Sequence, residues 1–296
     1  MTIKKNILTY IVIAVLLFPF FSLAQTDQFN SLRLATTDSD RAIAHQELKD
    51  YLSQRLNEAL TTEDLQPLID NWPAGNASAG SGSEKVIILS WNSERLDRTQ
   101  DYGGFIIFGF EKVGRITTFK WSELTHNRNE DPTNVARSYR VDDWPGAIYY
   151  ELILTHVKKS PVYTLLGWDG ADGQVTRKIM ETMIVTNDRI RIGVPYLKTE
   201  EGLRKRHVLE YGDALQATLH YEAENNRIVL DRLAPSDPSL MGATAFYGPT
   251  MEYDAFVWDG KKWMFTQDVE VSNNNKSSRR NKIYNDPRSS RTNRRN

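Results

Sequence analysis

The sequence predicts a mainly β protein, an antiparallel hairpin meander folded as a sandwich or a rolled sheet, with a helical segment at its N-terminus. Three observations lead to this prediction. Short runs rich in β-branched and aromatic residues repeat from residue 85 onward. Turn-forming dipeptides, among them Asp259-Gly260, separate successive runs. Before residue 74 the apolar residues recur with a helical spacing instead.

Residues 1–24 have the three parts of a cleavable signal peptide. Two lysines near the start precede an apolar run over residues 7–23, and residues 22–24 place a small side chain at both positions that signal peptidase reads. We therefore expect an exported protein, periplasmic or extracellular, whose mature chain begins at Gln25. The alternative is an uncleaved membrane anchor, but the apolar run is short for a membrane-spanning helix and contains Pro19. We expect no transmembrane span after cleavage.

Composition and charge narrow the possibilities further. The chain has 296 residues, of which 40% are hydrophobic and 25% charged, as in ordinary globular proteins. It has no cysteine, which excludes disulfides, thiolate catalysis and cysteine-ligated zinc. Residues 272–296 carry eight basic residues and one acidic residue, a net charge of +7. Without this tail and the signal peptide, the remaining body has a net charge of about −10.

The basic tail, residues 272–296, contains almost no apolar side chain, so we expect it to be disordered. Its cations predict weak attraction to an anionic envelope polymer or to lipid headgroups. Nucleic acid is not an expected partner, because an exported protein rarely meets it. The candidate contacts in the tail are Arg279, Arg280, Lys282, Arg288, Arg291, Arg294 and Arg295.

Residues 25–73 form the predicted helical N-terminal segment. Residues 25–38 are polar and without periodicity, which indicates a flexible stretch. Over residues 40–60 an apolar residue recurs every four positions, which predicts a helix capped by Ser39 or Asp38. A second short helix is expected over residues 61–72. The residues that form the predicted apolar stripe of the longer helix are Ala44, Leu48, Leu52, Leu56 and Leu60.

Residues 74–84 are nearly all Gly, Ala, Ser and Asn, so we expect a flexible linker. The β-rich body then covers residues 85–271. Its first expected strands are residues 86–89, 105–110 and 148–157.

Explicit turns predict the later hairpins of the body. Asn187-Asp188, Gly212-Asp213 and Asn225-Asn226 each separate two strand-like runs, and Asp259-Gly260 is expected to form a two-residue turn. The body should hold about ten to thirteen strands, by the pattern of runs and turns. A small β-propeller is the alternative, suggested by two Trp-Asp-Gly triplets that begin at Trp168 and Trp258. Blade repeats recur with a shorter period, which disfavours the propeller.

Several short sequence segments of the body resemble a group of exported β-rich proteins of Bacteroidota-type bacteria. The resemblance covers residues 85–272, and it implies export and no catalytic function, because no activity is assigned to that group. The basic tail lies outside it. The segments that carry the resemblance are residues 163–170, 233–236, 246–249 and 258–263.

No catalytic motif stands out, so we assign no catalytic residue, metal ligand or cofactor. The five histidines lack zinc-site spacing, and His220 is expected to be solvated. Residues 169–173 faintly resemble a calcium loop, but most of the required oxygen ligands are missing, so a Gly-rich hairpin loop is the preferred interpretation. The carboxylates Asp142, Asp143 and Asp254 lie near aromatic residues, an ingredient of sugar sites.

The sequence therefore does not decide between two classes of function. The preferred hypothesis is a non-enzymatic binding or scaffolding module of the envelope or of the secreted fraction. The alternative is a hydrolase that acts on envelope polymers or glycans through carboxylate chemistry.

Overall fold

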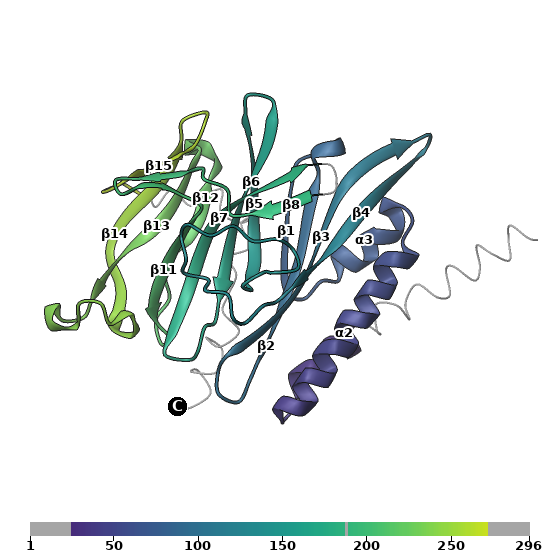
Figure 1. The fold of residues 1–296 in the computed structure, drawn as a ribbon, viewed down its shortest axis with the longest axis horizontal. Coiled ribbons are helices and arrows are strands. Elements are labelled where there is room, and N and C mark those ends of the chain that lie inside the picture. The colour runs from purple at the N-terminus through teal and green to yellow at the C-terminus, as the bar shows by residue number, and fades with distance from the viewer. Residues whose placement is uncertain (1–24, 187–188, 272–296) are drawn as a thin grey trace, which may run out of the picture. The chain divides into compact units, whose positions relative to one another are not determined.

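The computed structural model describes residues 25–186 and 189–271, so the expected signal peptide and the basic tail lie outside the described residues. The chain divides into two compact units. The described part of the first unit is residues 25–73 with residues 111–119, and that of the second is residues 74–110 with the chain from residue 120 onward. Figure 1 shows the helices and strands of both.

The first unit is built on helices, as the apolar periodicity predicts. Residues 25–34 are helical, so the prediction of a flexible stretch over residues 25–38 is wrong. Phe29 packs edge-on against Trp72, with 5.3 Å between the ring centroids, and this burial offsets the entropy of ordering a polar segment. Helices α2 (Asp38–Glu58) and α3 (Thr62–Asp70) follow.

Helix α2 confirms the predicted stripe, since Ala44, Leu48, Leu52 and Leu56 are buried, although Leu60 lies beyond the helix and is exposed. Its N-cap is Thr37, not Ser39 or Asp38, and the Thr37 hydroxyl accepts a hydrogen bond from the Asp40 backbone N–H. Helix α3 starts with a capping box between Thr61 and Asp64.

The second unit confirms the prediction of a mainly β, antiparallel architecture. Its strands form three sheets, which we call sheets I, II and III. Sheet I has the order β1 (Gly75–Ala79), β2 (Val86–Glu94), β3 (Gln100–Val113) and β4 (Ile116–Thr125), with the far ends of β3 and β4 belonging to the first unit. Sheet II has the order β11 (Arg206–Gly212), β7 (Val175–Thr186), β6 (Ser160–Asp169) and β5 (Ile148–Val157), and β8 (Arg189–Ile192) also pairs with β7.

Sheet III has the order β10 (Gly202–Arg204), β9 (Leu197–Thr199), β15 (Trp263–Thr266), β14 (Tyr247–Trp258), β13 (Arg227–Pro235) and β12 (Leu219–Glu222). The described residues thus hold fifteen strands, more than the ten to thirteen expected. The excess includes the three-residue strands β9 and β10, which are too short to produce a sequence pattern.

Sheet II lies between the other two sheets, because each of its faces contributes to a separate core. On one face Leu165 and Ile179 pack in a core with residues of sheet I, such as Ile106. On the other face Leu166 and Met180 pack in a core with residues of sheet III. Successive residues of a strand point to opposite faces, so two covered faces explain the nearly continuous burial of β6 and β7. Stacked sheets are a sandwich arrangement, not the radiating blades of the propeller alternative.

Two predicted local structures are wrong. The expected linker, residues 74–84, contains β1, which pairs with β2, and the 3₁₀ turn η1 (Gly82–Glu84). Gly212-Asp213 does not close a hairpin, because β11 pairs with β7 in sheet II whereas β12 pairs with β13 in sheet III. The chain therefore crosses between sheets at the position where a turn was expected.

The other predicted hairpins are present. Strands β7 and β8 pair from Thr186 and Arg189, although Asn187-Asp188 between them lies outside the described residues. Strands β12 and β13 pair around the 3₁₀ turn η2 (Ala223–Asn225), and Asn226 adopts a left-handed conformation with φ of 47°.

Strands β14 and β15 also pair as expected, with Trp258 opposite Trp263. The connection is longer than the predicted Asp259-Gly260 turn, however, because the Asp259 backbone N–H bonds to the Lys262 carbonyl oxygen at 3.0 Å. The turn is therefore centred on Gly260 and Lys261. The Asp259 carboxylate accepts bonds from the backbone N–H groups of Lys261 and Lys262, both at 2.7 Å, which fixes this geometry.

Candidate functional site

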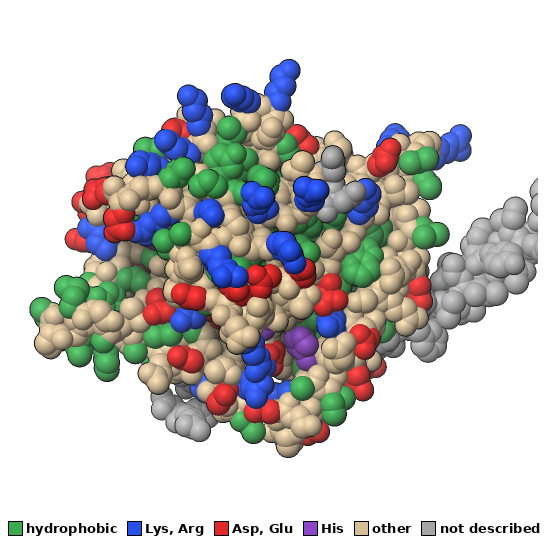
Figure 2. Space-filling model, in the orientation of Figure 1, with side chains coloured by type: hydrophobic (Ala, Val, Ile, Leu, Met, Phe, Trp, Pro, Cys, Tyr) green, Lys and Arg blue, Asp and Glu red, His purple; other side chains and the backbone are tan. Residues whose placement is uncertain are grey.

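The strongest candidate site is an arm between β13 and β14, residues 236–251, which we call the apolar arm. It contains the 3₁₀ turns η3 (Pro238–Leu240) and η4 (Thr244–Phe246) and the beginning of β14. Three large apolar side chains are exposed along it: Met241 is 73%, Phe246 52% and Met251 85% exposed. Figure 2 shows hydrophobic side chains gathered on the projection at the left of the molecule, where Figure 1 places the connection between β13 and β14.

A β-bulge presents Met251 to solvent. The register between β13 and β14 shifts between Asp231 and Leu233, so that Arg232 lies opposite extra residues of β14. Met251 sits in this irregularity with φ of 70°, a left-handed conformation that is costly for a residue other than glycine. Bulges re-aim side chains, and strain in a native backbone is concentrated at functional positions.

Ion pairs hold the bulge in place. The Arg232 guanidinium binds Glu252 at 2.7 Å and Asp268 at 2.7 Å, and it also pairs with the buried carboxylate of Asp254. The Thr250 hydroxyl donates to the Arg232 carbonyl oxygen at 3.2 Å. The backbone on both sides of Met251 is therefore fixed, so its side chain is displayed from a rigid support.

The rest of the apolar arm is also anchored. The Tyr247 hydroxyl donates to the Met241 sulfur at 3.4 Å and accepts from the Gly242 backbone N–H at 3.1 Å. Turn η4 approaches the end of β11 so closely that a Cβ at Gly212 would lie 2.5 Å from the Ala245 carbonyl oxygen. Only glycine permits this approach, which brings Phe246 to its exposed position.

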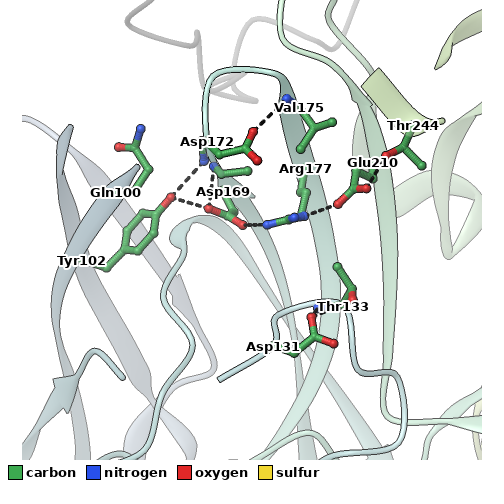
Figure 3. Close-up of polar contacts among 12 residues, drawn as sticks. Gln100, Tyr102, Asp131, Thr133, Asp169, Asp172, Val175, Arg177, Glu210 and Thr244 are labelled. Carbon is green, nitrogen blue, oxygen red and sulfur yellow. Dashed lines mark hydrogen bonds and ion pairs between the residues drawn. The ribbon is translucent and has the colours of Figure 1, made fainter. Parts of the chain in front are cut away.

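A chain of polar contacts runs from η4 across sheet II, as Figure 3 shows. The Thr244 hydroxyl donates to Glu210 on β11, and Glu210 pairs with Arg177 on β7. Arg177 also binds Asp169 at the end of β6, at 2.9 Å. The Asp169 carboxylate in turn accepts the Tyr102 hydroxyl from β3 at 2.7 Å. This relay connects the apolar arm, which extends from sheet III, to strands of sheets II and I.

The relay is a structural anchor because Arg177 lies between the carboxylates of Asp169 and Glu210 and pairs with both. Burial alone would lower the pKa of Arg177, but the carboxylates of Asp169 and Glu210 outweigh it and raise that pKa. Residues 170–174 form the loop of the β6–β7 hairpin, and Asp169 at the end of β6 accepts the Ala171 backbone N–H at 2.9 Å. The hairpin-loop interpretation of these residues is therefore confirmed.

The carboxylates considered for sugar chemistry are not brought together. Asp142 pairs with Arg140 in the loop after β4, and Asp143 there accepts the Asn127 side-chain amide at 2.8 Å. Asp254 belongs to β14 of sheet III, where Arg232 holds it.

The histidines are engaged in local contacts. His126 lies 3.9 Å from Asp101, and burial lowers its pKa. Its Nδ1 accepts the Tyr102 backbone N–H at 3.2 Å, and the ring is also tied to the Pro145 backbone. The His220 side chain is 32% exposed and its pKa is lowered mainly by desolvation, so the expectation of a solvated side chain is met only in part.

Within the described ranges no group of three or more His, Asp or Glu side chains is arranged to hold a metal ion. No helix among residues 25–186 and 189–271 is both long and apolar enough to cross a membrane. The tail candidates from Arg279 to Arg295 lie outside the described residues.

Comparison with known protein families, with curated proteins and with solved structures gives no match. The resemblance to exported β-rich proteins therefore stays a prediction. Sequence reasoning missed the apolar arm, although a signal was present. Residues 236–251 consist largely of turn-forming Ser, Pro, Gly and Thr with a single charge, which predicts a surface loop, yet they include Leu240, Met241, Phe246 and Met251.

Proposed function

We propose that the protein is an exported, non-enzymatic binding module that contacts a protein partner through the apolar arm. The observation that carries this proposal is the exposure of Met241, Phe246 and Met251 on an arm whose backbone is anchored. Exposed apolar side chains that are held rigidly mark an interaction surface, since their contacts cost little further ordering. Methionine adapts to irregular partner surfaces, and aromatic residues are enriched at binding hot spots.

Charge around the apolar arm favours a protein partner over an anionic membrane. The only charged residue within residues 236–251 is Asp237. Beside the arm, Glu252 is 60% and Asp268 73% exposed. These two carboxylates form an acidic rim that would repel anionic headgroups. The rim complements a partner protein whose surface has an apolar concavity flanked by basic residues, and this is the partner we propose.

The test begins with a photo-crosslinking amino acid at position 246 or 251 of the full-length protein in the producing cell. The captured protein is then purified and its dissociation constant is measured with Phe246→Ser, Met251→Ser and wild type. We expect each variant to weaken binding by about tenfold or more, as for hot-spot truncations. Leu203→Ser is the matched control, because Leu203 lies on β10 and is also 52% exposed.

Three results would overturn the proposal. One is equal affinity of the wild type and both arm variants for the purified partner. Another is that Leu203→Ser weakens the affinity for the partner as much as the arm variants do, which would indicate non-specific adhesion. The third is crosslinking only to lipid or to a second copy of the chain, which would replace the proposed occupant.

A further inference from the structure

The hairpins of the second unit carry basic residues at one end of sheets II and III. The turn between β5 and β6 is Lys158-Lys159, β8 begins with Arg189 followed by Arg191 on the same face, and the turn before β15 contains Lys261 and Lys262. We call these six residues the basic end. All are exposed except Lys262, which is half-buried. Figure 2 shows Lys and Arg side chains gathered over the upper part of the visible face, where Figure 1 places these hairpins.

Strand register brings the three basic segments to the same end. Val157 pairs with Ser160 around the two lysines, and Tyr163 of β6 pairs with Met183 of β7, which continues toward β8. The Trp263 indole N–H donates to the Thr164 hydroxyl at 2.8 Å, which fixes the start of β15 against β6. The apolar arm is separate, since it lies at the beginning of β14 whereas Lys261 follows its end.

The basic end differs in its pairing from several arginines of the second unit, although Lys198 and Lys205 also form no ion pair with a described residue. Arg177, Arg206 and Arg232 each bind carboxylates. At the other end of β6, Arg98 binds Asp213 at 3.0 Å. By contrast, none of the six residues of the basic end forms an ion pair with another described residue. The Asp259 carboxylate in the same turn interacts electrostatically with Lys261 and Lys262, and the described residues provide no closer ion-pair partner for the six cations.

The backbone of Lys158 is a second, independent observation. Lys158 has φ of 58°, a left-handed conformation that Gly or Asn adopts at lower cost in a two-residue hairpin turn. The sequence has lysine there in spite of this preference. A lysine in this conformation breaks a local preference, and we take this as support for a role of its side chain.

We infer that the basic end binds the anionic headgroups of a lipid membrane. The cations sit on the convex ends of hairpins, which suits a flat charged surface, whereas a polymer strand is usually bound along a groove. Because screening limits attraction to about 8 Å at physiological ionic strength, the tips must touch the headgroups. Lysines at a turn extend far enough to do so.

The test measures binding of the full-length protein to vesicles of mixed phosphatidylglycerol and phosphatidylcholine, with pure phosphatidylcholine as reference. Each removed charge should weaken binding roughly fivefold, so Lys158→Gln/Lys159→Gln should lose roughly 25-fold. Lys158→Arg/Lys159→Arg keeps the charge and should bind as wild type does. Arg128→Gln is the matched control, because Arg128 is 46% exposed and pairs with Asp101 away from the basic end.

The proposal fails if the double glutamine variant binds the mixed vesicles as tightly as wild type, since the tail would then supply the attraction. It also fails if Arg128→Gln weakens binding as much per charge, which would indicate a general charge effect. A soluble polyanion, dextran sulfate, distinguishes the source. If the double glutamine variant loses affinity for dextran sulfate but still binds the mixed vesicles as wild type does, the ligand is a polymer and the membrane proposal is wrong.

Discussion

Replacing Arg206 with methionine should destabilise the second unit severely. Arg206 and Glu181 lie opposite each other on β11 and β7, and their side chains are 1% and 2% exposed. The Arg206 Nε donates to Glu181 at 3.0 Å, and the guanidinium carbon lies 4.5 Å from the centroid of the Tyr139 ring. Burial alone would lower the pKa of Arg206, but Glu181 outweighs it and raises that pKa, so the pair stays ionised.

The magnitude follows from the charge that is left behind. Arg206→Met strands the Glu181 carboxylate in the core, and breaking a buried pair in this way costs roughly 3–5 kcal/mol. In a domain of this size each kcal/mol lowers the melting temperature by about 2–4 °C, so we expect a drop of roughly 6–20 °C. The Glu181→Gln/Arg206→Met double variant leaves no charge, and the amide oxygen of the introduced glutamine can still accept the Tyr149 hydroxyl, as the Glu181 carboxylate does. It should recover at least about 1 kcal/mol relative to the single variant.

Urea unfolding followed by tryptophan fluorescence measures these changes, since Trp144 and Trp168 are buried in the same core. Arg128→Met is the control: it breaks a half-exposed ion pair and should cost less than about 1 kcal/mol. A cost below about 1 kcal/mol for Arg206→Met, or a double variant less stable than the single one, would refute the reasoning.

Three further outcomes are expected. Burial raises the pKa of Glu151 to about 7 in the folded chain, so its contribution to stability is complete below the ordinary value of 4.5 and is lost as pH rises to about 7. Comparing melting temperatures of wild type and Glu151→Gln between pH 5 and 8 should show a flatter profile for the variant; parallel profiles would contradict the shift. Gly260 has φ of 92° and open space around it, so Gly260→Val should cost about 1 kcal/mol through backbone strain alone, and an unchanged melting temperature would argue against it. N-terminal sequencing of the exported protein should read Gln25 first, and a start at Met1 in a detergent-extracted form would indicate an anchor.

The sequence predicted best those helices and strands in which apolar residues recur at a regular spacing. Helix α2 and strand β5 carry long regular patterns, and the structure confirms both within two residues at each end. Strand β1, residues Gly75–Ala79, has no such pattern. It forms because β2 offers a ladder and because its small residues fit closely, with a Cβ at Gly75 only 2.5 Å from the Ile148 side chain. Tertiary contact overrode local composition there.

The turn-forming residues indicated where the chain changes direction, but they did not indicate which strands each turn connects. Asp213, expected in a hairpin turn, accepts the Thr176 hydroxyl and the Arg98 guanidinium, both at 3.0 Å. These partners are 37 and 115 residues away, so no local signal could indicate them. The relay beneath the apolar arm has the same character, since Asp169, Arg177 and Glu210 come from three strands.

The distribution of charge links the two proposed surfaces. The body is acidic overall, yet several of its carboxylates are neutralised inside the fold, as Glu181 is by Arg206 and Asp254 by Arg232. Each internal ion pair removes one charge of either sign, so the charge at any point of the surface depends on where the remaining acids and bases lie. At one end of β14, Glu252 and Asp268 outnumber Arg232 beside the apolar arm, and at the other end lie the cations of the basic end, which form no ion pair with a described residue. A module with these two ends would hold a protein partner away from an anionic membrane that it touches with its hairpin tips. Salt should then weaken membrane binding far more than partner binding, because exposed charges are screened whereas apolar contacts are not.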